Sequence, residues 1–164
     1  MPTDSYIMPV PFLNVLNGGD HSGNTMAFQE FMIAPVGAQS VFEAVQFASE
    51  TYSTLKNVIS EKFGTAAISI GDEGGFAPPL SHPHEALDLL VEAVKRAGHE
   101  GKIKFGIDPA SQSFFRAEHY DYNLGYKWQE NSLKLSPSQL GDLYHDLMKT
   151  YPIILLEDPF AQDA

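Results

Sequence analysis

The stretch PIILLED, residues 152–158, runs from four consecutive apolar residues into two carboxylates, and this form decides the fold class. A near-continuous apolar run of this length is typical of a parallel strand that is covered on both faces. Two other stretches have the same form, KIKFGID at 102–108 and AAISIGDE at 66–73. We therefore predict three strands, each ending in acidic residues.

Helical patterns lie before each of these strands. The stretch 40–64 repeats apolar residues at helical spacing and stops at a glycine, and 81–98 places acids early and bases late. The stretch 136–152 begins with Ser-Pro and stops before Pro152. For the first helix we predict one apolar stripe, formed by Val41, Val45, Ala48, Tyr52, Leu55 and Ile59. Helices that alternate with strands predict an α/β fold.

The acids at the strand ends are Asp72, Glu73, Asp108, Glu157 and Asp158. One acid at such a place is more often a helix cap or part of a solvated turn. In α/β folds, however, the carboxyl ends of parallel strands converge on the face where ligands bind. Carboxylates that meet there repel one another unless a cation or a proton neutralises them. The pattern predicts a site for a hard divalent cation, and it favours Mg²⁺ over Zn²⁺ because the chain has no cysteine and no HExxH pair.

The N-terminal third contains a glycine-rich loop, GGDHSGN at 18–24, which we call the histidine loop because it carries His21. The stretch AFQEFMIAP that follows sets Glu30 within an apolar strand. A carboxyl group buried in this way has a raised pKa. The alternative is that Glu30 lies on the exposed side of an edge strand. The other histidines are predicted to face solvent: His82, His84, His99, His119 and His145.

Composition limits the partners. The 164 residues predict one domain, and 21 acids against 10 bases give a formal net charge of −11, which repels nucleic acid. No apolar run approaches the ~18 residues of a membrane span. We expect a cytoplasmic protein. The segment 113–135 alternates aromatic and polar residues about Asn123–Gly125, which predicts an inserted hairpin with no chemistry of its own.

These features together resemble the enolase family. The segments that carry the resemblance, in order and at compatible spacing, are PVPFLNVLNGG (9–19), the histidine loop, AFQEFMIAPVGA (27–38), GDEGGFAP (71–78), the strand ending in Asp108, and YPIILLEDPF (151–160). The resemblance implies the first half of a modified βα (TIM) barrel, within the C-terminal catalytic domain of an enolase. It also implies the reversible, Mg²⁺-dependent dehydration of 2-phosphoglycerate to phosphoenolpyruvate.

By the same resemblance, individual residues take roles. Glu73 is similar to the general acid for departure of the C3 hydroxyl, with Glu30 as its carboxylate neighbour. Gln29, Glu30 and His21 resemble substrate-binding residues of the family. Asp108 and Glu157 resemble two of the three carboxylates that hold Mg²⁺. Two departures are Asp20, where the family often has a neutral Ser or Ala, and Pro109.

The resemblance identifies no motif here for the third metal carboxylate, the lysine base or the phosphate-binding arginine. We therefore expect a partial barrel over residues 1–164, without the N-terminal domain or the second barrel half, and inactive alone. Its partners would be the rest of an enolase or a second copy of the chain; complete enolases are homodimers. The alternative is a non-catalytic, enolase-derived binding or assembly module, or an antigen. An acidic calcium-binding protein ranks last because no DxDxDG loop occurs.

Overall fold

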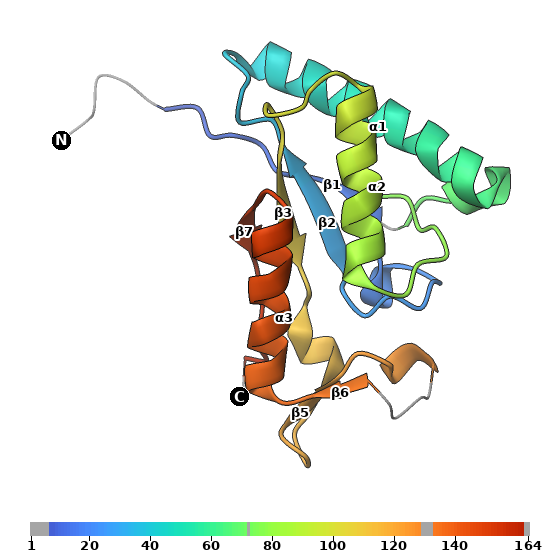
Figure 1. Ribbon diagram of the computed structural model, residues 1–164, viewed down its shortest axis with the longest axis vertical. Helices are drawn as coiled ribbons and strands as arrows, with labels where there is room; N and C mark the ends of the chain where they lie inside the picture. Colours follow the sequence, from blue (N-terminus) through green and yellow to red (C-terminus); the bar gives the residue numbers. More distant parts are fainter. Residues whose placement is uncertain (1–6, 72, 129–132, 163–164) are drawn as a thin grey trace.

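The computed structural model describes residues 7–71, 73–128 and 133–162. Its centre is a four-stranded sheet (Figure 1). The strands, in spatial order, are β1 (Leu13–Asn17), β2 (Glu30–Ala34), β3 (Lys104–Asp108) and β7 (Ile153–Leu156). The β1–β2 and β2–β3 pairs are antiparallel and only β3–β7 is parallel, so the sheet is mixed rather than wholly parallel. The loop from β1 to β2 has no crossover helix, and a parallel pair requires a long crossover.

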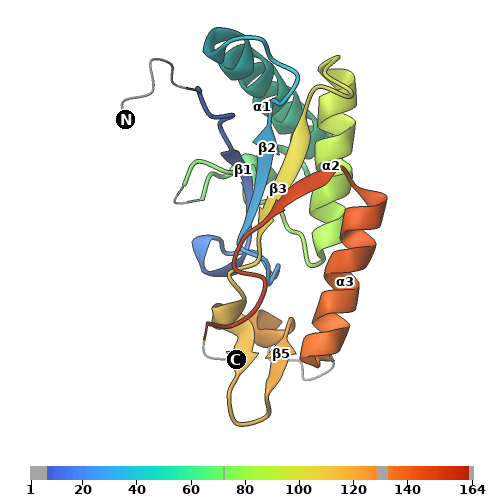
Figure 2. The same cartoon turned by 90° about the vertical axis from the view of Figure 1, so that its left-hand side faces the viewer.

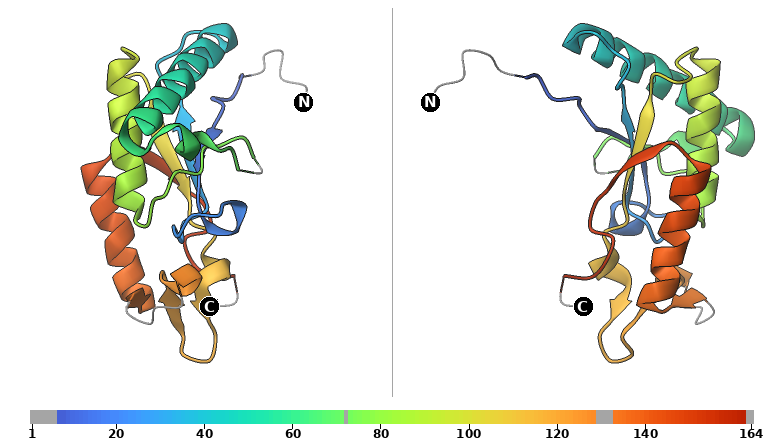
Figure 3. Two further views of the ribbon diagram at one scale, coloured as in Figure 1. Left: turned by 90° about the vertical axis from the view of Figure 1, so that its right-hand side faces the viewer. Right: turned by 60° about the vertical axis from the view of Figure 1, so that its left-hand side comes forward.

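Three long helices accompany the sheet: α1 (Val41–Phe63), α2 (Pro83–Arg96) and α3 (Pro137–Thr150). Figures 2 and 3 show α2 and α3 along the same face of the sheet, while α1 packs against α2. Both α1 and α3 begin at a serine whose hydroxyl accepts a backbone N–H, at Ser40 and Ser136. All three predicted helices are confirmed, with ends close to the caps that the sequence indicates. The α/β class is confirmed as well.

The predicted strand at 66–73 is wrong. Thr65–Ile68 forms a short 3-10 helix, η2, and Ile70 makes a single antiparallel bridge to Phe76. The alanines and serine of this stretch offer little surface to bury, and Ile70 is 61% exposed. Phe76, which is 1% exposed, lies beside Leu16 of β1 instead. Through this bridge the chain at Phe76 runs alongside β1 in space. Asp72 lies outside the described residues.

The buried face of α1 also differs from the predicted stripe. Val41 and Val45 are 46% and 53% exposed, whereas Phe47 is 6% exposed. Phe42 is 81% exposed as well, so the buried side is the one that carries Phe47 together with Ala44, Ala48 and Leu55. The buried residues are Ala44, Phe47, Ala48, Thr51, Leu55, Val58 and Ile59.

His99 contradicts the prediction that it faces solvent, because it is only 6% exposed. Its Nε2 lies 2.6 Å from a carboxylate oxygen of Glu50, and its ring packs 4.4 Å from the ring of Phe47. An acid and an aromatic ring of α1 therefore cover this imidazole, which follows the end of α2 in the sequence. His82, His119 and His145 are exposed as predicted, and His84 is half-buried beside Asp146.

The inserted segment forms a small antiparallel sheet, which confirms the predicted hairpin and adds a third strand. Its strands are β4 (Phe115–Arg116), β5 (Asp121–Asn123) and β6 (Lys134–Leu135). The tight turn lies at 117–120 rather than at Asn123–Gly125, and Arg116 Nε closes it by donating to Asp121 Oδ1 at 2.7 Å. The ring of Phe114 stacks on that of Phe28, 6.1 Å away, and so joins this segment to the core.

Candidate active site

Three of the predicted site residues stand at one end of the main sheet. Glu30, the first residue of β2, lies directly opposite Asp108, the last residue of β3. Glu157 follows β7, and its backbone N–H donates to the carbonyl of Ile107 at 3.0 Å. The convergence predicted for parallel strands therefore occurs at Asp108 and Glu157, and antiparallel pairing brings Glu30 to the same end.

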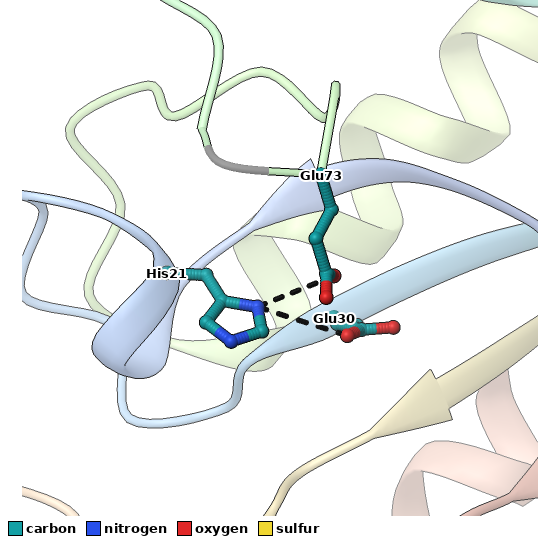
Figure 4. Close-up of side chains that lie close together, drawn as sticks. All are labelled: His21, Glu30 and Glu73. Atoms are coloured by element: carbon teal, nitrogen blue, oxygen red, sulfur yellow. Dashed lines mark ion pairs between the residues drawn. The ribbon is translucent and has the colours of Figure 1, made fainter.

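His21, Glu30 and Glu73 form a compact cluster (Figure 4). His21 Nδ1 lies 3.2 Å from Glu73 Oε2 and 3.8 Å from Glu30 Oε1. His21 ends the short 3-10 helix η1 (Gly19–His21), Glu30 begins β2, and Glu73 lies in the glycine turn after residue 71. Three separate segments thus aim their side chains at one point.

Glu73 is held by residues that the sequence did not single out. Asn14, in β1, donates from Nδ2 to Glu73 Oε2 at 3.1 Å. Tyr52 of α1 donates its hydroxyl to the carbonyl of Gly74 at 2.6 Å. A Cβ atom on Gly75 would lie 2.1 Å from Asn17 Oδ1, so the turn passes very close to β1. Asn14 is within the motif PVPFLNVLNGG, but only the fold reveals which acid it contacts.

The two glutamates have opposite pKa shifts. Burial, a hydrogen bond to Glu73 and the nearby negative charges raise the pKa of Glu30 to about 8. The hydrogen bond from Glu30, together with His21 and Asn14, lowers the pKa of Glu73. A proton shared by the pair therefore resides on Glu30. The predicted rise for Glu30 is confirmed, and the edge-strand alternative is wrong because β2 lies between β1 and β3.

Asp108 is 9% exposed. Burial and the charges of Glu157, Asp158 and Glu73 raise its pKa, against a hydrogen bond of 2.8 Å from the Ala110 N–H to Oδ1. The charge of Glu157 thus adds to the cost of ionising Asp108, a cost that a bound cation would relieve.

Hydrogen bonds tie together the loops that follow β3 and β7. Ser111 Oγ lies 2.9 Å from the hydroxyl of Tyr144, and both groups donate to the carbonyl of Pro159. The Ser111 N–H also donates to the Asp158 carbonyl at 3.2 Å. The loops that follow Asp108 and Glu157 are therefore bonded to each other, which holds these two acids in a fixed relative position.

Gln29 joins this region through its main chain. Its N–H donates to the carbonyl of Asp108 at 3.2 Å, and its carbonyl accepts from the N–H of Gly18 at 2.8 Å. Gln29 thus connects the histidine loop to the end of β3. Its side chain is half-buried.

A cavity of about 680 Å³ opens beside the cluster. One wall is residues 20–24 of the histidine loop, and the other consists of Phe63, Ala66 and neighbouring residues up to Gly71. His21 lines it, so a ligand in this space could reach the imidazole. The cavity is open enough to admit a small molecule from solvent.

Residues 5–164 match the family described as enolase, C-terminal TIM barrel domain. The chain belongs to this family. Over the described residues this enolase C-terminal domain has an open sheet rather than a closed barrel. Membership of the family supports a lyase of the enolase superfamily. Among the described helices of this domain, none is both long and apolar enough to span a membrane.

The donor set of the enolase domain fits a hard divalent cation. Asp108 and Glu157 offer carboxylate oxygens from neighbouring strand ends, and oxygen ligands are those that Mg²⁺ prefers. In the part of the chain that the structure describes, the one group of three possible ligands is His21, Glu30 and Glu73, whose ligand atoms lie within 4.8 Å of one another. Asp108 and Glu157 do not belong to that group, so among the described residues the pair of strand-end carboxylates and the cluster are separate candidates for holding a cation.

Proposed function

We propose that this chain contributes the acid side of the enolase reaction, the reversible dehydration of 2-phosphoglycerate to phosphoenolpyruvate. One observation carries the proposal: His21, Glu30 and Glu73 converge at the sheet end that also presents Asp108 and Glu157. Loss of the C3 hydroxyl requires a proton donor, and stabilising the negative charge formed at C2 requires positive charge nearby. This end of the sheet has residues for both tasks.

The paired carboxyl groups supply the proton. Glu30, whose pKa of about 8 keeps it protonated near neutral pH, passes its proton to the ionised Glu73, and Glu73 delivers it to the departing hydroxyl, which leaves as water while Glu30 is left ionised. This division refines the simpler expectation that Glu73 alone is the acid. His21 hydrogen-bonds the substrate from the cavity side, and Gln29 keeps its loop against β3.

Asp108 and Glu157 are the proposed Mg²⁺ ligands. Electrostatic stabilisation of negative charge on the substrate is the chemistry that the cation supplies when bound. The loops that Ser111 and Tyr144 bond together hold the two carboxylates at a fixed position relative to each other. Fixed ligands suit Mg²⁺, which tolerates little distortion of its coordination.

The proton at C2 requires a base, which we propose comes from the rest of an enolase or from a second copy of the chain. Among the described strands, β7 pairs on one side only, and its Ile154 is 52% exposed. A free edge with exposed apolar residues favours pairing with another strand. Such pairing would extend the sheet beside Glu157.

The test combines binding with turnover. Titration calorimetry measures 2-phosphoglycerate binding to the folded chain with excess Mg²⁺, and ultraviolet absorbance follows formation of phosphoenolpyruvate. We expect Mg²⁺-dependent binding and, where turnover occurs, its loss in Glu73→Gln with the fold retained. Turnover at the original rate by that variant excludes Glu73 as the acid. Folded chain that binds neither Mg²⁺ nor 2-phosphoglycerate contradicts the proposal and leaves the non-catalytic role.

A further inference from the structure

The inserted segment holds the tip of the histidine loop. Lys127 lies in the 3-10 helix η4 (Tyr126–Trp128), which connects β5 to the residues before β6. Its ammonium group donates to the carbonyls of Gly19 and Ser22, the latter at 2.8 Å. Those two residues flank Asp20 and His21 in the sequence. The ammonium group of Lys127 therefore closes the turn that contains His21.

Tyr126 makes a second contact with the same tip. Its hydroxyl donates to Asp20 Oδ1 at 3.0 Å. Its ring stacks on Phe114 at 6.3 Å between centroids, and Phe114 in turn stacks on Phe28, which is fully buried. The hydroxyl is thus aimed from a ring that is anchored in the core.

The base of the histidine loop is fixed in a different way. Gly19 N–H donates to the carbonyl of Met26 at 2.9 Å, and Asn24 Nδ2 donates to the carbonyls of Asn17 and Pro78, each at 2.9 Å. These bonds anchor both ends of the loop to β1 and to the segment after Glu73. The contacts from Tyr126 and Lys127 act on the residues between those ends.

The same contacts explain how the negative charge of Asp20 can lie close to a site for a negatively charged substrate. A carboxylate beside a phosphate-bearing substrate would weaken binding, and Asp20 is next to His21. In the structure Asp20 instead accepts from Tyr126, and its charge attracts the partly buried ammonium of Lys127. Asp20 thus helps to hold the loop through its bond from Tyr126, and the positive charge of Lys127 offsets the negative charge of its carboxylate.

We propose that Tyr126 and Lys127 are positioning residues for His21, and that they fix the loop tip so that the imidazole faces Glu30 and Glu73. We call these two residues the clamp. The consequence for substrate binding rests on the proposed function; the consequence for the order of the loop does not.

Amide hydrogen exchange of residues 19–24 tests the clamp directly. Lys127→Met removes two charge-assisted bonds, and we expect exchange of these amides to accelerate about tenfold or more. Tyr126→Phe removes one bond and should accelerate it about threefold. Lys127→Arg keeps a charged donor and should restore most of the protection. The controls are Lys149→Met and Tyr120→Phe, which change exposed side chains elsewhere.

Faster exchange confined to the histidine loop supports the clamp, whereas unchanged exchange in Lys127→Met, or an equal rise over the whole chain, overturns it. Calorimetry with 2-phosphoglycerate and Mg²⁺ separates the two proposals. If the original chain binds, Lys127→Met should bind more weakly than Lys149→Met. If the original chain does not bind, the proposed function fails, while the exchange result still decides whether the clamp exists.

Discussion

Glu30 of β2 is the direct antiparallel partner of Asp108 of β3. The first residue of one strand and the last residue of the next therefore place two carboxyl groups side by side at the sheet end. Asp108 contributes to the raised pKa of Glu30, after burial and Glu73. The register of two strands thus adds to the proton affinity of Glu30 in the proposed acid pair.

Glu30→Gln should remove a pH dependence of stability. Because the folded-state pKa of Glu30, about 8, exceeds the ordinary value of 4.5, the native state keeps a proton that the unfolded chain loses between these pH values. The free energy of unfolding therefore falls as pH rises through this window, by at most about 1.4 kcal/mol per pH unit. Urea unfolding from pH 5.5 to 8 should show a flatter profile for the variant.

The matched control is Glu118→Gln, which changes an exposed acid in the turn of the small sheet. It should leave the profile of the original chain unaltered. A Glu30→Gln profile that falls as steeply as the original would show that Glu30 is ionised in the folded chain.

Gly75→Ala should displace the turn that carries Glu73. The added Cβ would lie 2.1 Å from Asn17 Oδ1, and Asn17 is 2% exposed and has little room to move. Overpacking of this kind costs about 1–3 kcal/mol. Thermal unfolding measures the loss, and the carboxyl ¹³C resonance of Glu73 should shift as its contacts with His21 and Asn14 change.

Gly23→Ala provides the comparison because a Cβ there meets nothing within 4 Å. Its stability should equal that of the original chain or exceed it by about 0.4–1 kcal/mol, since alanine restricts the unfolded chain more than glycine does. Equal stabilities for the two variants would mean that the Gly75 turn can relax without cost.

Glu85→Gln tests the start of α2. Burial favours the neutral form of Glu85, but the N–H groups of Ser81 and His82, each 2.8 Å from Oε2, outweigh it and lower its pKa. The stabilisation is therefore present above pH 4.5 and is lost as pH falls below it. The variant should be less stable by about 0.5–1 kcal/mol at pH 7, with a smaller difference at pH 3. Chemical unfolding at both pH values, with Glu100→Gln as control, measures this; equal losses at pH 7 and pH 3 would exclude a charge effect.

The sequence predicted features that depend on local chemistry, and it missed those that depend on contacts between distant segments. Ser40 and Ser136 cap helices through neighbouring N–H groups, so their patterns located α1 and α3. The prediction of a strand at 66–73 was wrong because an apolar run does not distinguish a strand from a 3-10 turn. The hydrogen bond from Lys127 to the carbonyl of Gly19 joins two segments 108 residues apart in the sequence, which no local pattern encodes.

The candidate site, too, was predicted in part and missed in part. His21, Glu30, Asp108 and Glu157 were predicted from strand ends and a glycine loop, and the fold places all of them at one end of the sheet. Asn14 was missed because an asparagine in an apolar strand indicates no partner. The raised pKa of Glu30 was predicted from its place in an apolar strand, whereas the lowered pKa of Glu73 was not, because it depends on contacts with Glu30, His21 and Asn14.

Asp108→Asn should weaken Mg²⁺ binding by about tenfold or more, because the substitution removes a charge from a proposed oxygen ligand. The asparagine oxygen can still accept the N–H of Ala110, so the turn after β3 should persist. Calorimetry with Mg²⁺ measures the change, and Asp142→Asn, on an exposed position of α3, is the control. If Asp108→Asn binds Mg²⁺ normally while Glu30→Gln does not, the cation lies in the cluster of His21, Glu30 and Glu73. Those carboxyl groups would then be its ligands, and the acid of the reaction would have to be found elsewhere.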